Sequence, residues 1–132
     1  MPEGICPSHQ GCLEGLAGGP SMEKRWGKPA YALPADHIGW EIEAYYLAQF
    51  CASAFLILST ERIILGGGVM AQRRLFPKVR KQTEKLLNGY LPWVKDLDSL
   101  IVPPLYYPDS GTFGALLLGK RALEQDSEET ED

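Results

Sequence analysis

The sequence predicts an α/β fold in which helices flank an incomplete parallel sheet. Three observations support this prediction. Residues 37–58 form a long, mostly apolar segment of helical length, the run Ile63-Ile64-Leu65 leads into three glycines, and a second short apolar run ends at Pro103-Pro104. An aliphatic run that ends in glycines is typical of a buried parallel strand followed by a loop. Because two strands are few for a sheet of this kind, we expect the chain to hold only part of it.

Length and composition fit one small globular domain. The chain has 132 residues, of which 45% are hydrophobic and 23% charged, and such values argue against global disorder. The net charge is −4, and acidic residues crowd residues 124–132, which we expect to form a disordered tail. No basic surface is indicated, so we expect no nucleic-acid partner. The first four residues lack the positive charge and the apolar core of a signal peptide, which predicts a cytoplasmic protein.

The first predicted element is a loop rich in metal ligands. Cys6, His9 and Cys12 are each separated by two residues, and Pro7 and Gly11 are turn formers that can bring the three side chains together. Zn²⁺ prefers Cys sulfur and His nitrogen in a tetrahedron, so the loop predicts three zinc ligands, with no fourth at a suitable spacing. Two reduced surface cysteines beside a chance histidine remain an alternative. A Cys6–Cys12 disulfide is another, which the low cysteine content disfavours.

A short helix is expected over residues 13–24. Gly18-Gly19-Pro20 interrupts or ends it, because proline removes a helical hydrogen bond. Consecutive glycines before a proline also allow the backbone to approach another group closely, but a plain helix break is the interpretation that the pattern alone favours. Residues 21–26 can form another turn or two, which residues 27–29 end.

The longest predicted helix covers residues 37–58. Asp36 is a candidate N-cap, and the second half is apolar on nearly every face, so we expect it to lie between a sheet and other helices. Its most apolar run, residues 45–58, is shorter than the roughly 18 to 20 residues needed to span a bilayer, so no membrane partner is expected. Cys51 is interpreted as a small core residue rather than a reactive thiol. His37 is interpreted as a surface residue with no site role.

Residues 63–70 predict a strand followed by a loop that faces a ligand. Ligands gather at the carboxyl ends of the strands in open α/β sheets, where Gly66, Gly67 and Gly68 fall. Glycine lacks a Cβ, so a nucleotide can lie flat against the backbone, with Val69 and Met70 following. The pattern is neither a P-loop nor a Rossmann fingerprint. A flexible loop without a ligand is the alternative.

Two further helices and a strand complete the prediction. A helix is expected over residues 75–88, ended by Asn88-Gly89, and its basic residues are interpreted as a solvated face. Residues 99–102 predict the second strand. The final helix should cover residues 112–123, and Gly114 and Gly119 within it suggest close packing against a neighbour.

Four stretches of the chain occur in an order that resembles one protein family. They are Gly-Ile-Cys-Pro-Ser-His-Gln-Gly-Cys-Leu-Glu-Gly-Leu-Ala-Gly-Gly-Pro at residues 4–20, Arg-Trp-Gly at 25–27, Trp-Glu-Ile-Glu-Ala-Tyr-Tyr-Leu-Ala-Gln at 40–49, and Ile-Ile-Leu-Gly-Gly-Gly-Val-Met at 63–70. Together they resemble the bacterial ROK-family fructokinases. The resemblance covers residues 4–123, which match somewhat less than half of such an enzyme, at its C-terminal end.

The resemblance implies an actin-like, ribonuclease-H-like ATPase fold, of which residues 1–123 would be part of the C-terminal lobe. It implies phosphorylation of D-fructose by ATP, with Mg²⁺, to give D-fructose 6-phosphate and ADP. A ROK kinase for glucose or mannose is an alternative, because those sugars share hydroxyls with fructose. The mode of subunit association stays open, with a homodimer as one option.

The resemblance also implies roles for individual residues. A structural Zn²⁺ would be held by one upstream histidine together with Cys6, His9 and Cys12. Glu14 matches the glutamate that hydrogen-bonds sugar hydroxyls, a task that suits a carboxylate fixed beside a metal loop. Residues 66–70 match the loop beside the adenosine of ATP, and Pro20 matches a second nucleotide contact.

Parts of the family pattern are absent from this sequence. They are the Asp-x-Gly-Gly-Thr phosphate loop, the Asn-Asp pair whose aspartate acts as general base, and the upstream histidine ligand. Phosphoryl transfer needs the phosphates positioned and a base on the attacking hydroxyl, so we expect the isolated chain to be inactive. A non-catalytic zinc- and nucleotide-binding or dimerisation module is the alternative from another class. We also expect exposed apolar helix faces and marginal stability. A ROK repressor is disfavoured because no helix-turn-helix is indicated.

Overall fold

The computed structural model describes residues 4–9 and 11–129. The chain forms two compact units, Met1–Val102 and Pro103–Asp132, and each is described by itself.

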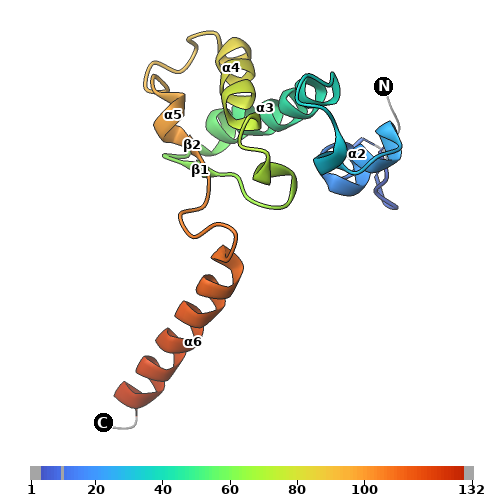
Figure 1. Cartoon of the computed structure of the whole chain (residues 1–132). Coiled ribbons are helices and arrows are strands. Elements are labelled where there is room, and N and C mark those ends of the chain that lie inside the picture. Colours follow the sequence, from blue (N-terminus) through green and yellow to red (C-terminus); the bar gives the residue numbers. More distant parts are fainter. Residues whose placement is uncertain (1–3, 10, 130–132) are drawn as a thin grey trace. The chain divides into compact units, whose positions relative to one another are not determined.

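The core of the first unit lies between two helices, α3 (Gly39–Leu58) and α4 (Leu75–Leu87), which pack side by side (Figure 1). Their buried residues recur every three or four positions, which places them on one face of each helix. From α3 the buried apolar residues are Trp40, Ala44, Ala48, Cys51, Ala52 and Phe55. From α4 they are Leu75, Phe76, Val79 and Leu87. Cys51 is fully buried, so the prediction of a core residue is confirmed, and burial raises the pKa of its thiol to about 12.

The start of α3 differs from the prediction. Asp36 does not cap the helix, which begins at Gly39 with no side-chain cap from Ile38. Instead, Nδ1 of His37 accepts the Gly39 N–H at 3.0 Å, and the His37 ring packs edge-on against Trp26 with centroids 4.8 Å apart. A Cβ on Gly39 would lie 2.8 Å from both rings, so only glycine fits. His37 is therefore a structural residue rather than a free surface side chain.

Length does not exclude α3 from spanning a membrane, contrary to our expectation. The apolar run continues into a helix of 20 residues, which is long and apolar enough to cross a bilayer by length and composition alone. Core helices of soluble proteins can be equally long and apolar. The packing of α3 on α4 is the observation that argues for a core helix.

The predicted parallel pairing is confirmed. Strands β1 (Ile63–Ile64) and β2 (Ile101–Val102) are parallel, with Ile63 opposite Ile101 and Ile64 opposite Val102. Ile63 and Ile101 are buried, but 62% of Ile64 is exposed. Within the described residues the sheet therefore has two short strands and one solvent-exposed face. This agrees with the expectation that the chain holds only part of a sheet. An unpredicted short helix, α5 (Leu97–Leu100), precedes β2 and is capped by the Asp96 side chain.

The other helix ends lie near the predicted positions, but the break expected at Gly18-Gly19-Pro20 falls at residues 17 and 18, so the next helix begins at Gly19 rather than at residue 21. The break after residue 16 separates α1 (Leu13–Leu16) from α2 (Gly19–Trp26), and Pro20 lies in the first turn of α2. Gly27 ends α2 in the left-handed conformation, and Asn88 does the same for α4. Two 3₁₀ turns complete the unit, η1 (Ala30–Ala32) and η2 (Val69–Ala71).

The second unit consists mainly of one helix, α6 (Ser110–Glu129). Its first turn is fixed by stacking of Phe113 on Tyr106, with ring centroids 4.7 Å apart. A Cβ at Gly114 or Gly119 would meet no atom within 4 Å, so the close packing expected at these glycines is not seen in the described residues. The helix also continues to Glu129, beyond the end that was expected at residue 123. Residues 130–132 lie outside the described part of the chain.

Candidate functional site

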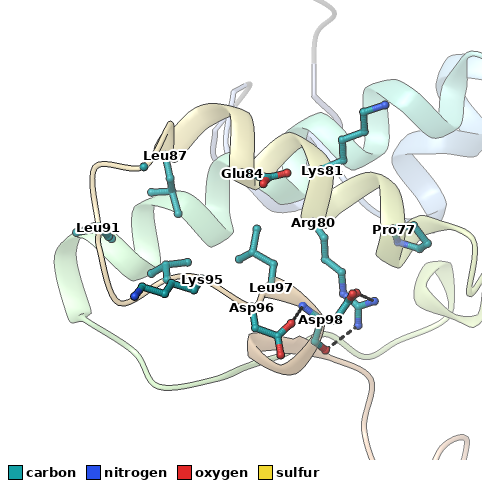
Figure 2. A pocket seen from close by; sticks show the side chains of 12 residues that line it. Pro77, Arg80, Lys81, Glu84, Leu87, Leu91, Lys95, Asp96, Leu97 and Asp98 are labelled. Carbon is teal, nitrogen blue, oxygen red and sulfur yellow. Dashed lines mark hydrogen bonds and ion pairs between the residues drawn. The ribbon is translucent and has the colours of Figure 1, made fainter.

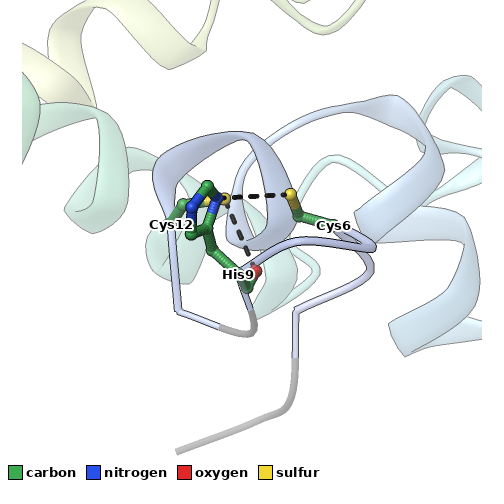
Figure 3. Close-up of side chains that lie close together, drawn as sticks. All are labelled: Cys6, His9 and Cys12. Carbon is green, nitrogen blue, oxygen red and sulfur yellow. Dashed lines mark hydrogen bonds between the residues drawn. The ribbon is translucent and has the colours of Figure 1, made fainter.

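The three predicted zinc ligands lie together at the start of the chain (Figure 3). We call residues 6–14 the Cys/His loop. The ligand atoms of Cys6, His9 and Cys12 are all within 4.8 Å of one another, and Cys6 Sγ lies 3.8 Å from His9 Nδ1. A tetrahedral zinc with ordinary bond lengths needs a sulfur–nitrogen separation of about 3.6 Å. Both cysteines are free thiols, so they form no disulfide in this structure. The donor set and its spacing fit Zn²⁺.

Hydrogen bonds from α1 and α2 hold this loop in place. The Gly15 N–H donates to Cys12 Sγ at 3.4 Å, so the second cysteine also caps α1. The Gly15 carbonyl accepts the Ile5 N–H at 2.9 Å and the hydroxyl of buried Ser21 at 2.9 Å. Sequence reasoning missed Gly15 and Ser21, because neither residue type carries a metal-binding signal. The loop is therefore anchored by the two helices that follow it.

The surroundings of Cys6 favour its thiolate form. The backbone N–H groups of Ser8 and then His9, followed by the Cys12 side chain, hold the pKa of Cys6 below its ordinary value. Desolvation and the negative charge of Glu14 act in the opposite direction. The thiolate is the form that ligates metals, so the loop is prepared for a cation.

Gly15→Ala is expected to weaken zinc binding about tenfold, as changes in the supporting shell of a metal site do. A Cβ at this position would lie 3.0 Å from Cys6 Cβ and 3.1 Å from the Cys6 backbone nitrogen, so Cys6 has to move. Gly11→Ala is the matched control, because a Cβ there meets no atom within 4 Å. Chelator competition measures both variants. Unchanged affinity in Gly15→Ala would show that Gly15 does not position Cys6.

The predicted nucleotide residues line one pocket of about 770 Å³ in the first unit. All five residues of the glycine loop, residues 66–70, contribute to it, and so does Pro20 from the start of α2. Gly67 has a φ of 97°, a conformation that favours glycine, and a Cβ on Gly68 would meet no atom within 4 Å. The structure thus brings together two segments that are about 50 residues apart in the sequence.

Glu14 does not line this pocket. A sugar contact and a nucleotide loop of one kinase should face a common cleft, but Glu14 is exposed in the first turn of α1, with its Oε2 3.9 Å from Cys6 Sγ. Its backbone carbonyl accepts the Ser21 hydroxyl at 3.2 Å, which ties it to α2. The carboxylate therefore belongs to the Cys/His loop, and only the α1–α2 connection links it to the pocket.

Glu43 is a pocket residue that sequence reasoning missed. It comes from α3, is 1% exposed and lines the pocket, and its Oε2 has no hydrogen-bond partner. Burial raises the pKa of Glu43 from 4.5 to about 7, although the Gly18 N–H and the charge of Arg25 lower it. A signal was available in the sequence, because Glu43 falls three residues after Trp40 and four before Leu47 on one helix face, and Trp40 is buried and Leu47 half-buried.

A second pocket, of about 450 Å³, lies between α4 and the segment that leads into α5 (Figure 2). None of the predicted site residues lines it. Arg80 on its wall pairs with Asp98 at 2.6 Å and donates two hydrogen bonds to the Ile101 carbonyl, at 3.0 and 2.8 Å. Arg80 was predicted to belong to a solvated face, but it joins α4 to β2. These contacts give Arg80 a structural role, and we assign no ligand to this pocket.

The comparisons with known proteins agree with the arrangement of motifs. The model of the ROK family matches residues 1–122. The chain is 42% identical over 128 residues to a putative fructokinase of Bacillus subtilis, covering 95% of this chain and 43% of that protein. It is 45% identical over 119 residues to a fructokinase of Pediococcus pentosaceus, covering 90% of this chain and 41% of that protein. It is 42% identical over 118 residues to a fructokinase of Streptococcus mutans, covering 89% of this chain and 40% of that protein. The chain thus spans about two fifths of the length of these relatives.

Proposed function

Because this chain belongs to the ROK family, we propose that it is the C-terminal part of a sugar kinase that transfers phosphate from ATP to the 6-hydroxyl of D-fructose. The relatives described above are named fructokinases, which supports the sugar. The observation that carries the proposal is the shared pocket of Pro20 and the glycine loop, because these are the two segments that the family resemblance assigns to the nucleotide.

In this proposal the glycine-loop pocket holds the adenosine of ATP. Backbone without side chains at residues 66–68 leaves room for a flat ring, and Leu47, Val69 and Met70 supply apolar walls. The phosphate loop and the general base would come from polypeptide outside this sequence, and Mg²⁺ would be bound with the phosphates. Phosphoryl transfer requires both parts, so the chain alone should bind nucleoside without catalysing the transfer.

The Cys/His loop would hold a structural Zn²⁺ through Cys6, His9 and Cys12, with the fourth ligand from outside this chain. The metal would supply rigidity to the loop. Glu14 lies in the first turn of α1, two residues after Cys12, and its carbonyl accepts the Ser21 hydroxyl, which holds its backbone in place. The Glu14 carboxylate then accepts hydrogen bonds from two sugar hydroxyls in fixed geometry.

A coupled assay for ADP release tests this function. The purified chain should show no turnover with fructose and ATP. A chimera should show turnover when it joins the N-terminal part of the Bacillus subtilis relative to residues 4–123, and Glu14→Gln in the chimera should abolish most of it. Glucose and mannose in parallel assays identify the preferred hexose. Turnover by the isolated chain, or an inactive chimera that is folded and contains zinc, would overturn the proposal.

A further inference from the structure

Two residues without a predicted role line the glycine-loop pocket, Tyr31 from η1 and Glu43 from α3. One is aromatic and exposed, and the other is ionisable and buried. Together they give the pocket a flat apolar surface and one polar group, which is the usual make-up of a site for a small organic ligand.

Tyr31 presents an aromatic ring that is largely free of protein contacts. The residue is 80% exposed, yet its backbone is held within η1 by hydrogen bonds from the Ala32 N–H to the Pro29 carbonyl at 2.9 Å and from the Leu33 N–H to the Ala30 carbonyl at 3.2 Å. A large ring in contact with water costs free energy that a flat ligand would recover. Its position on the pocket therefore suits stacking on a base.

Glu43 offers the complementary polar group. An unpartnered oxygen on a carboxyl that is 1% exposed leaves an acceptor without its donor. Arg25 does not supply this donor, because Glu43 and Arg25 form no ion pair within the described residues. The Arg25 side chain instead donates to the Leu16 carbonyl at 2.8 Å and lies over the Tyr46 ring. A donor brought by the ligand would complete the site.

We propose that this pocket selects a purine nucleoside by stacking of its base on Tyr31 and by a hydrogen bond from the same nucleoside to Glu43. The donor is a ribose hydroxyl or the exocyclic amine, both of which a carboxyl accepts. This inference rests on the proposed nucleotide role of the pocket. The volume of about 770 Å³ is ample for a nucleoside.

The first experiment titrates the chain with adenosine, which needs no phosphate loop, and follows binding by NMR. Tyr31→Ala should weaken binding about tenfold, within the range measured for loss of base stacking. Tyr31→Phe should stay within about twofold of the parent, because it keeps the ring. Tyr90→Ala is the matched control, since Tyr90 is also highly exposed but does not line this pocket. Unchanged binding in Tyr31→Ala would overturn the stacking role.

The second experiment compares adenosine with its analogues that lack the 2′-hydroxyl, the 3′-hydroxyl or the 6-amino group. At least one analogue should bind the parent about tenfold more weakly, as loss of a partner to a buried polar group predicts. That difference should vanish in Glu43→Leu and persist in Glu43→Gln, which keeps an acceptor. Equal binding of all four ligands to the parent would overturn the role of Glu43, whether or not the variants fold.

Gly68→Val separates this inference from the function on which it rests. The substitution adds bulk in the pocket at a position with an ordinary φ of −62°. If Gly68→Val abolished adenosine binding and Tyr31→Ala left it unchanged, the inference would be wrong but the nucleotide pocket would stand. A parent chain that binds no adenosine would remove both.

Discussion

Replacing Cys12 with serine is expected to lower the zinc affinity of the chain at least about 100-fold, because changes to residues that only support a ligand already cost about 10- to 100-fold. Cys12 Sγ is one of three clustered ligand atoms, and a serine hydroxyl does not give up its proton at neutral pH as a thiol can. Cys12 also caps α1 through its bond from Gly15, but serine is a preferred N-cap residue. The substitution therefore removes a ligand and preserves the helix start.

Competition with a chromophoric chelator measures the affinity, and metal analysis after dialysis gives the stoichiometry. Ser8→Ala is the matched control, because Ser8 is exposed in the same loop, is no ligand, and keeps the backbone N–H that stabilises the Cys6 thiolate. If Cys12→Ser retained zinc as tightly as the parent, the three residues would not form a metal site. Zinc held by the Ser8→Ala variant and lost by Cys12→Ser is the expected result.

Glu43→Gln is expected to change how stability depends on pH. The pKa of Glu43 is raised from 4.5 to about 7 in the folded chain, so between these values the folded state keeps a proton that the unfolded state releases. Stability present at low pH is therefore lost as the pH rises from about 4.5 to 7, and the loss amounts to about 3 kcal/mol. Glutamine is neutral throughout and removes this slope. Between pH 4.5 and pH 8, the difference in free energy of unfolding between the variant and the parent should therefore shift by about 3 kcal/mol in favour of the variant.

Urea unfolding at several pH values between 4.5 and 8 gives the free energy of unfolding of the variant and the parent at each pH. Glu41→Gln controls for charge on the same helix, because Glu41 is exposed and pairs with Lys78 at the surface. A surface pair contributes at most about 1 kcal/mol, so its removal should leave most of the slope in place. If Glu43→Gln and the parent lost stability in parallel as the pH rises, Glu43 would not be the group that carries a proton into the folded state.

Elements fixed by short-range backbone preferences could be predicted from the sequence. Asn88 and Gly89 ended α4 as expected, because left-handed backbone favours these residue types wherever they follow a helix. The parallel pairing of β1 followed from an aliphatic run ahead of glycines. The prediction that Cys6, His9 and Cys12 lie close together is confirmed, as is the grouping of residues 66–70 at one pocket, because each group is contiguous or nearly so in the sequence.

Features that depend on distant packing could not be predicted. Asp36 has the right chemistry for an N-cap, but the contact of Trp26 with His37 and Gly39 places the helix start elsewhere. Glu43 was passed over because glutamate is rarely buried, and its surroundings come from α2, η1 and the glycine loop as well as α3. Glutamate is a good helix former, and the glutamates after position 123 allow α6 to extend beyond the end that the sequence suggested.

The brevity of the two strands bears on how copies of this chain meet one another. Each strand has only two residues and one unpaired side within the described part of the chain. Fibril formation needs continuous extended segments of about six residues. Here only Leu65 separates β1 from three glycines, and Pro103-Pro104, which lack backbone N–H groups, follow β2. The bare sheet edges are thus too short to template a growing cross-β ladder.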